Sequence, residues 1–227
     1  MNPSKVFVFL FLVLSSAAIF PGSRASDPDA LQDLCIADTS KGIYGTKVNG
    51  FPCKEAANIT AADFFFTGLA NAATIDNSVG STVTPANVDK IPGLNTLGVS
   101  LARIDYAADG GLNPPHVHPR ATEIVFVLEG ELDVGFITTA NKLISKTIKK
   151  GEIFVFPKGL LHFQQNNKDK PASVIAAFNS QLPGTVSVAA ALFSSSPAVG
   201  DGVLARAFQI DSQEVGEIKS KIAAKKK

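Results

Sequence analysis

Apolar and polar residues alternate along the middle of this chain, from Leu97 to about Ser195. The alternation comes in short runs separated by turn residues, and this pattern predicts many short β-strands in a sandwich or barrel. The expected strands are 97–106, 123–128, 132–137, 153–156, 173–178 and 186–189. In the first of them Leu97, Val99, Leu101 and Arg103 share one face. Ile153–Phe156 is apolar on both faces, so we expect both to be buried, the outer one against another element or chain.

The segments that flank this region have a different character. Residues 26–60 predict an irregular arm, and a short helix is expected near 61–67, where Thr60 and Asp63 form a capping box. Residues 68–96 are rich in Gly, Asn, Ser, Thr and Pro, which is typical of loops with short edge strands. Helical spacing returns at Asp201–Phe208 and Asp211–Ala224. The predicted organisation is a signal peptide (1–25), an arm (26–60), a β-barrel domain (61–195) and a C-terminal helical segment (196–227).

The beginning of the chain predicts a secretory signal peptide. Lys5 precedes the apolar run Val6–Leu14, and Ser23-Arg24-Ala25 offers a cleavage site after Ala25. The run is shorter than the roughly 20 apolar residues that a membrane helix needs. We therefore expect a secreted mature chain that begins near Ser26 and has no membrane anchor.

Two further features fit an oxidising extracellular compartment. The chain has two cysteines, Cys35 and Cys53, and a bridge between them would contribute roughly 3 kcal/mol. The alternative is a pair of buried free thiols. Asn58-Ile59-Thr60 is an N-glycosylation sequon, so a glycan is expected on Asn58. The net charge of +1, with no basic stripe, argues against a nucleic-acid partner.

All three histidines of the chain fall in one pattern with metal-binding character. His116 and His118 are two positions apart, and such residues of a strand point to the same face. Glu123 begins the next predicted strand, and His162 comes from a later one. Mixed nitrogen and oxygen donors suit Mn(II), Fe(II), Ni(II) or Zn(II), and the spacing does not choose among them. The alternative is that the histidines are ordinary core residues with satisfied hydrogen bonds.

Longer patterns surround these four residues. Gly110, His116, His118, Glu123 and Gly130 fit G-x5-H-x-H-x4-E-x6-G, and Gly151, Pro157, Gly159, His162 and Asn166 fit G-x5-P-x-G-x2-H-x3-N. These patterns resemble the two cupin motifs. Further segments resemble germin-like proteins: 27–35, 50–54, 92–98, 113–116 and 178–184.

The resemblance implies an all-β cupin jelly-roll barrel with an N-terminal disulfide-linked arm and C-terminal α-helices. It also implies a plant extracellular glycoprotein of the apoplast and cell wall, with manganese on the four ligands. Germin-like proteins assemble as a trimer of dimers, so the resemblance implies a homo-hexamer. In that assembly Val215, Ile218 and Ile222 would be buried between subunits.

The family includes oxalate oxidases, superoxide dismutases and proteins with no established activity. In the oxalate oxidases an asparagine stands where this chain has Ala102, whereas a second active-site asparagine corresponds to Asn113. Loss of one amide donor would weaken oxalate binding by about 1–3 kcal/mol. We therefore expect a superoxide dismutase-type enzyme that produces hydrogen peroxide in defence or stress, with Phe126 or Phe163 restricting access to the metal.

Two other functions compete with this one. The first is oxalate oxidase activity, in which the substrate is a small carboxylic acid. The second is a non-catalytic extracellular role as a binding or structural protein of the cell wall.

Overall fold

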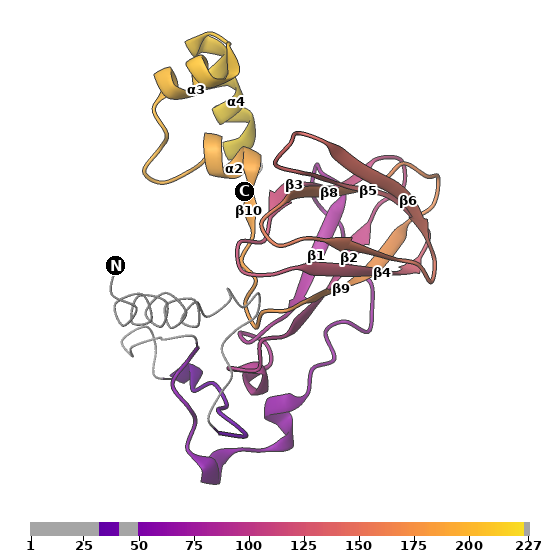
Figure 1. Ribbon diagram of the computed structural model, residues 1–227, viewed down its shortest axis with the longest axis vertical. Coiled ribbons are helices and arrows are strands. Elements are labelled where there is room, and N and C mark those ends of the chain that lie inside the picture. Colours follow the sequence, from indigo (N-terminus) through magenta and orange to yellow (C-terminus); the bar gives the residue numbers. More distant parts are fainter. Residues whose placement is uncertain (1–31, 41–49, 225–227) are drawn as a thin grey trace, which may run out of the picture.

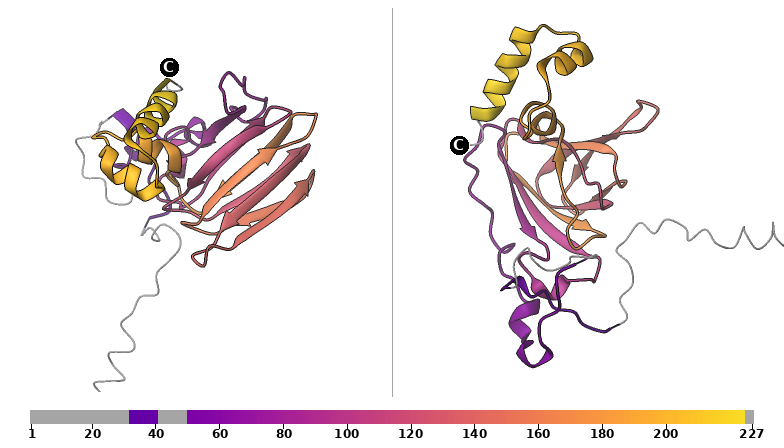
Figure 2. Two further views of the ribbon diagram at one scale, coloured as in Figure 1. Left: turned by 90° about the horizontal axis from the view of Figure 1, so that it is seen from above. Right: turned by 90° about the vertical axis from the view of Figure 1, so that its left-hand side faces the viewer.

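The computed structural model describes residues 32–40 and 50–224. The predicted signal peptide and its cleavage site lie outside the described residues. Within the described part, ten strands form two five-stranded sheets that face each other and enclose a barrel (Figures 1 and 2). The prediction of an all-β jelly-roll barrel is confirmed.

Both sheets are antiparallel, and their strands leave and re-enter each sheet out of sequence order. The first sheet contains, in spatial order, β1 (Ser81–Ala86), β2 (Ser100–Tyr106), β9 (Ala172–Phe178), β4 (Glu123–Glu129) and β7 (Ile153–Phe156). The second contains β10 (Val186–Ser187), β3 (Gly111–Val117), β8 (Leu161–Asn166), β5 (Glu131–Ile137) and β6 (Leu143–Lys149).

The hydrophobic core fills the space between the two sheets. Its buried side chains include Ile104, Tyr106, Val125, Val127, Leu132, Val134, Ile148, Phe156 and Val174. Full burial of one such aliphatic side chain contributes about 1.5–3 kcal/mol. The strand register aligns Glu123 with Phe178 on one side and Phe156 on the other, so a carboxylate projects into an otherwise apolar row.

The outer face of the first sheet is apolar and exposed in the single chain. Ile153 is 60% exposed and Val155 is 43% exposed, so the prediction that β7 is buried on both faces does not hold within one chain. The register places Val155 beside Ile124 and Ile153 beside Phe126. We call these four exposed residues of β4 and β7 the outer apolar face.

The N-terminal arm packs against the loop that precedes β2. Cys35 and Cys53 form the predicted disulfide, with Cα atoms 4.8 Å apart. The buried Asn95 side chain accepts a hydrogen bond from the Phe51 N–H (2.9 Å) and donates one to the Phe51 carbonyl (2.9 Å). The arm is therefore fixed by a covalent bond and by a buried amide.

Short 3-10 helices lie in and after the arm, among them η2 (Ala56–Asn58), η3 (Ala61–Phe64) and η4 (Pro92–Leu94). The capping box at Thr60 and Asp63 is confirmed, and the Thr60 N–H donates to the Asp63 carboxylate at 2.8 Å. The helix expected near 61–67 is shorter than predicted. Asn58 is exposed at the end of η2, where a glycan would find room.

Three α-helices follow the barrel and group together beyond one end of it (Figure 1). They are α2 (Val188–Phe193), α3 (Asp201–Phe208) and α4 (Ser212–Ala224). The predicted strand 186–189 was wrong after Ser187, because the run of alanines at 189–191 favours a helix. Asp211 is the cap of α4, since its carboxylate accepts the Glu214 N–H at 2.8 Å.

Val215 is fully buried within this chain's own helices, so its predicted burial between subunits was wrong. The reason is that α4 packs against both α2 and α3. Ile218 and Ile222 are only partly buried. Within the described residues, no helix is both long enough and apolar enough to cross a membrane.

Candidate metal centre

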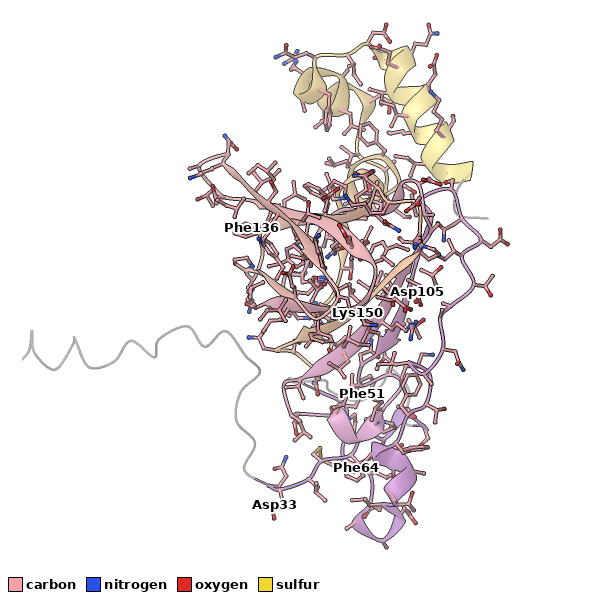
Figure 3. All side chains as sticks on the ribbon, turned by 90° about the vertical axis from the view of Figure 1, so that its right-hand side faces the viewer. Asp33, Phe51, Phe64, Asp105, Phe136 and Lys150 are labelled. Atoms are coloured by element: carbon pink, nitrogen blue, oxygen red, sulfur yellow. A yellow bond between two sulfur atoms is a disulfide. The ribbon has the colours of Figure 1, made fainter. Side chains whose placement is uncertain are left out.

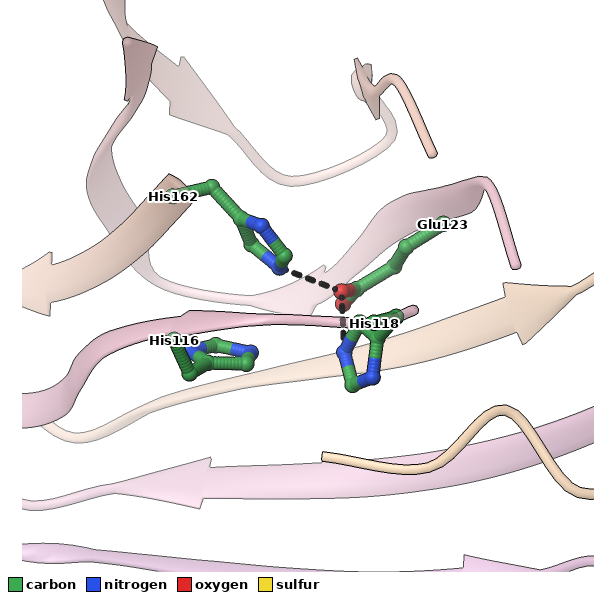
Figure 4. Close-up of side chains that lie close together, drawn as sticks. All are labelled: His116, His118, Glu123 and His162. Carbon is green, nitrogen blue, oxygen red and sulfur yellow. Dashed lines mark hydrogen bonds and ion pairs between the residues drawn. The ribbon is translucent and has the colours of Figure 1, made fainter. Parts of the chain in front are cut away.

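The four predicted ligands come together inside the barrel, as Figure 4 shows. His116 lies in β3, His118 directly after it, Glu123 at the start of β4, and His162 in β8. Each is at most 6% exposed, and one ligand atom from each lies within 4.8 Å of the others. This concentration of four buried donor side chains makes the cluster a candidate metal site.

The local backbone explains how β3 presents its histidines. β3 pairs with β8, and His116 lies opposite His162 in the register. The register shifts between Asn113 and His116, where Pro114 and Pro115 stand. Proline cannot donate a hydrogen bond to the neighbouring strand, so a proline pair is suited to such an irregularity. The paired His116 and His162 rings have centroids 4.2 Å apart.

Backbone carbonyls set the orientation of all three imidazole rings. Each Nδ1 lies within 2.8 Å of a carbonyl oxygen, which can only accept a hydrogen bond. Each Nδ1 therefore carries the proton, and each Nε2 keeps a free lone pair. The pairs are His116 with Pro114 (2.7 Å), His118 with Gly184 (2.6 Å) and His162 with Leu160 (2.8 Å).

The Glu123 carboxylate faces two of these lone pairs. Its Oε2 lies 3.0 Å from the His118 Nε2 and 3.1 Å from the His162 Nε2 (Figure 4, dashed lines). With neutral imidazoles, all the converging atoms are electron-pair donors and repel one another. A cation held among them removes this repulsion, so the donor set fits a divalent metal ion.

The electrostatics of the site produce the protonation states that metal binding needs. Burial, followed by the nearby His162, lowers the pKa of His116 to about 4. Burial by itself would raise the pKa of Glu123, but when a proton on Nε2 makes His118 and His162 positively charged hydrogen-bond donors, these two rings outweigh the burial and lower that pKa to about 2. His116 is therefore neutral and Glu123 ionised at neutral pH, as ligands must be.

A second layer of polar groups supports Glu123, and sequence reasoning missed it. The fully buried Gln164 donates from Nε2 to the Glu123 Oε1 at 3.5 Å, and the Tyr106 hydroxyl donates to the Gln164 Oε1 at 3.4 Å. Burial, followed by the charges of Glu123 and Asp105, raises the pKa of Tyr106 well above its usual range, so its hydroxyl keeps its proton. The available signal was spacing, because Gln164 stands two positions after His162 and faces the same side.

Aromatic rings form the walls around the ligands. The Phe156 ring stacks on His162 with centroids 4.6 Å apart, and the Phe178 ring meets His118 edge-on at 4.9 Å. These rings exclude water from two sides of the site and strengthen its electrostatic interactions.

The prediction that Phe126 or Phe163 restricts access was wrong. Phe126 is 43% exposed and belongs to the outer apolar face. Phe163 stands between the inward-facing His162 and Gln164, so the alternation of the strand turns it the other way.

The two positions that bear on oxalate both lie on the inner side of the barrel. Asn113 is half-buried and lies opposite Gln164 in the register of β3 and β8. Ala102 is buried and pairs with Ala176 in the row of Val125, two residues along the strands from the row that contains Glu123. Ala102 thus presents a methyl group to the barrel interior.

Known proteins with similar sequences cover almost the whole chain. Residues 67–216 match the model of the Cupin family. A germin-like protein of Arabidopsis thaliana, subfamily 2 member 4, is 66% identical over 224 residues, which cover 98% of this chain and 99% of that protein. The rhicadhesin receptor of Pisum sativum is 66% identical over 198 residues, with 87% of this chain and 89% of that protein covered.

A solved structure agrees with these sequence matches. An oxalate oxidase in complex with the substrate analogue glycolate is 44% identical, with a TM-score of 0.83 over 88% of this chain and 99% of that one. The similarity therefore extends from the sequence to the fold of most of the chain. This chain belongs to the germin-like proteins of the cupin family.

Proposed function

We propose that this chain is a secreted, manganese-dependent oxidoreductase that converts superoxide to oxygen and hydrogen peroxide. The observation that carries the proposal is the buried ligand set, in which three Nε2 lone pairs and one ionised carboxylate converge within 4.8 Å. Four protein ligands leave open positions on a six-coordinate ion, where a small substrate can bind.

His116, His118 and His162 would hold the ion through Nε2, and Glu123 through its carboxylate. A manganese ion held there would supply the one-electron redox chemistry by which two superoxide ions and two protons give one oxygen and one hydrogen peroxide. The chain's residues set the conditions for this exchange. The Nδ1–H bonds to carbonyls fix the rings and make each Nε2 a better donor, while Gln164 steadies the second oxygen of Glu123.

The surroundings of the ligands favour a small substrate. Phe156 and Phe178 wall the site with apolar rings, and Ala102 adds a methyl group where an amide would serve a larger anion. Superoxide has two atoms and needs only an open coordination position. Oxalate carries two carboxylates, and each unpaired oxygen in a buried site costs about 1–3 kcal/mol.

Oxalate oxidation is the second candidate, because the oxalate oxidase structure shares the fold at a TM-score of 0.83. The half-buried Asn113 on the inner side of the barrel also favours it. A binding role, of the kind that the name of the pea rhicadhesin receptor indicates, would require no turnover.

Hydrogen peroxide release separates these functions. Metal-replete protein is assayed separately with superoxide and with oxalate, and we expect peroxide above the spontaneous rate with superoxide only. Ala102→Asn should raise oxalate turnover about tenfold or more, since it restores about 1.4 kcal/mol or more of binding. Ala102→Leu has a similar size but no amide and is the matched control. Oxalate turnover that already exceeds the superoxide rate would refute the proposal, and absence of peroxide from both substrates would favour the binding role.

We further propose an extracellular, glycosylated protein of the plant cell wall, where a source of peroxide suits defence or stress. The disulfide between Cys35 and Cys53 supports an oxidising compartment, and the exposure of Asn58 supports a glycan there.

The assembly that we propose is a hexamer built as a trimer of dimers. Its support is the outer apolar face, because soluble monomers rarely expose contiguous apolar patches of this kind. The partly buried Ile218 and Ile222 of α4 offer a second apolar surface for contact with a neighbouring subunit.

A further inference from the structure

A hollow of about 450 Å³ lies at the end of the barrel away from the metal centre. Three turns converge on it: the one between β4 and β5, the one between β6 and β7, and the one between β8 and β9. Along β4, the chain from Glu123 to Gly130 spans about 23 Å at roughly 3.3 Å per residue. The hollow is therefore a different place from the ligand cluster.

The lining of the hollow is strongly basic. Its charged residues are Lys149, Lys150, Lys168, Lys170, Glu131 and Asp169. Four positive and two negative side chains leave a net charge of +2. The Glu131 carboxylate approaches the Nζ of Lys149 at 3.5 Å and that of Lys168 at 3.8 Å. Lys150 and Lys170 are exposed and form no ion pair within the part of the chain that the structure describes (Lys150 is labelled in Figure 3).

Two motif residues that do not bind the metal hold these turns in place. Gly130 has a φ of +78°, and a Cβ there would lie 2.8 Å from the Ala172 Cβ, so the tight turn requires glycine. The Gly130 carbonyl accepts the Lys150 N–H at 3.1 Å, which ties the first turn to the second.

Asn166 organises the third turn in a similar way. Its fully buried side chain accepts the Lys168 N–H at 3.0 Å and donates to the Lys170 carbonyl at 2.7 Å. The lysine backbones are therefore fixed in space, although their side chains are free to adjust.

We propose that this hollow is a binding site for a compact anion that carries two or more negative charges, of the carboxylate or phosphate class. A lysine ammonium is a point charge without the planar fork of arginine, so the site selects charge more than shape. A volume of about 450 Å³ falls within the range of small-molecule sites. The proposal concerns a second site and holds whatever the metal centre does.

Lysine labelling tests the location of the site on the full, metal-replete protein at low ionic strength. The probes are sulfate, inorganic phosphate and tricarballylate, with acetate at equal ionic strength as the monovalent control. At an anion concentration of five times Kd, the free fraction falls to about one sixth, so acetylation of Lys150 and Lys170 should slow about sixfold. Lys142, just before β6, and Lys146, on β6, are exposed and lie outside the hollow, so both should react at an unchanged rate.

Calorimetry on variants tests the two unpaired lysines. The double variant Lys150→Gln/Lys170→Gln should raise the dissociation constant of the multivalent anion about tenfold. The control Lys142→Gln/Lys146→Gln removes the same charge outside the hollow and should change that dissociation constant less than about twofold. His162→Ala should leave anion binding in place.

Several outcomes would overturn the proposal. They are equal weakening by both lysine pairs, no preference over acetate, and loss of binding with His162→Ala. Slow labelling of Lys150 and Lys170 without any anion would also overturn it, because the hollow would then be covered in the assembled protein.

Discussion

Ile153 offers the sharpest test of the assembly, because its side chain is the most exposed of the outer apolar face. It is 60% exposed in the single chain and lies beside Phe126 in the register. Replacement by lysine keeps a long side chain on β7 but places an ammonium group where we propose that two chains meet.

The size of the effect follows from the exposed fraction. Full burial of an isoleucine side chain is worth about 1.5–3 kcal/mol, so covering the exposed part contributes about 1.5 kcal/mol per chain. A two-fold interface contains the residue twice, which gives about 3 kcal/mol. Loss of that amount raises the dimer dissociation constant at least about a hundredfold, and burial of the charge adds to it.

Light scattering on the mature glycoprotein over a concentration series measures the change. The unmodified protein should have the mass of a hexamer, and Ile153→Lys should dissociate in the micromolar range. Leu143→Lys is the matched control, since Leu143 is 51% exposed but lies on β6 of the other sheet. An unchanged mass for Ile153→Lys, or equal dissociation of both variants, would refute the reasoning. A monomer mass for the unmodified protein would refute the assembly itself.

Three further predictions concern the metal, acid and processing. His162→Ala should lower the manganese content and the melting temperature together, because the ion stabilises the folded state. Gln165→Ala, on the same strand, is the control and should leave the manganese content and the melting temperature unchanged. Full manganese occupancy in His162→Ala would disprove the ligand assignment. Metal-depleted protein should lose stability as pH falls from 6.5 to about 4, because His116 binds a proton in the unfolded chain but not in the folded one. Glu123 should extend the loss from pH 4.5 to about 2, because its carboxylate is protonated in the unfolded chain before it is protonated in the folded one. A melting temperature that stays constant over this range would contradict it. Intact-mass analysis should show secreted protein that begins near Ser26 with one disulfide and a glycan that Asn58→Gln removes; two free thiols would contradict the first point.

The ligand set was predictable because strand geometry converts spacing into direction. Residues two apart on a strand share a face, which is why His116 and His118 converge, and the turn after β7 delivers His162 on the facing strand. Only the four ligands carry an obvious chemical signature. Gln164 and Tyr106 act through hydrogen bonds to residues about 40 to 60 positions away, and a single sequence does not reveal such pairings.

The errors arise where the choice of face or packing partner depends on register. Phe126 and Phe163 look like neighbours of the metal in sequence, yet each sits one position away from an inward-facing residue. Val215 has the spacing of an interface residue, but α2 and α3 of its own chain already cover it. The sequence establishes that a surface is apolar, and only the fold establishes what buries it.

The distribution of backbone and side-chain contacts also explains how one barrel can host different chemistries. The ligand rings are oriented by carbonyls of the main chain, at Pro114, Gly184 and Leu160, so side-chain changes elsewhere leave their geometry intact. Ala102 lies two residues along the strands from the row of Glu123 and is not one of the residues whose carbonyls orient the rings. A substitution there can therefore add or remove a substrate donor without altering metal affinity, and Ala102→Asn should change oxalate turnover while manganese content stays constant. A loss of manganese in that variant would show that the row containing Ala102 supports the ligands after all.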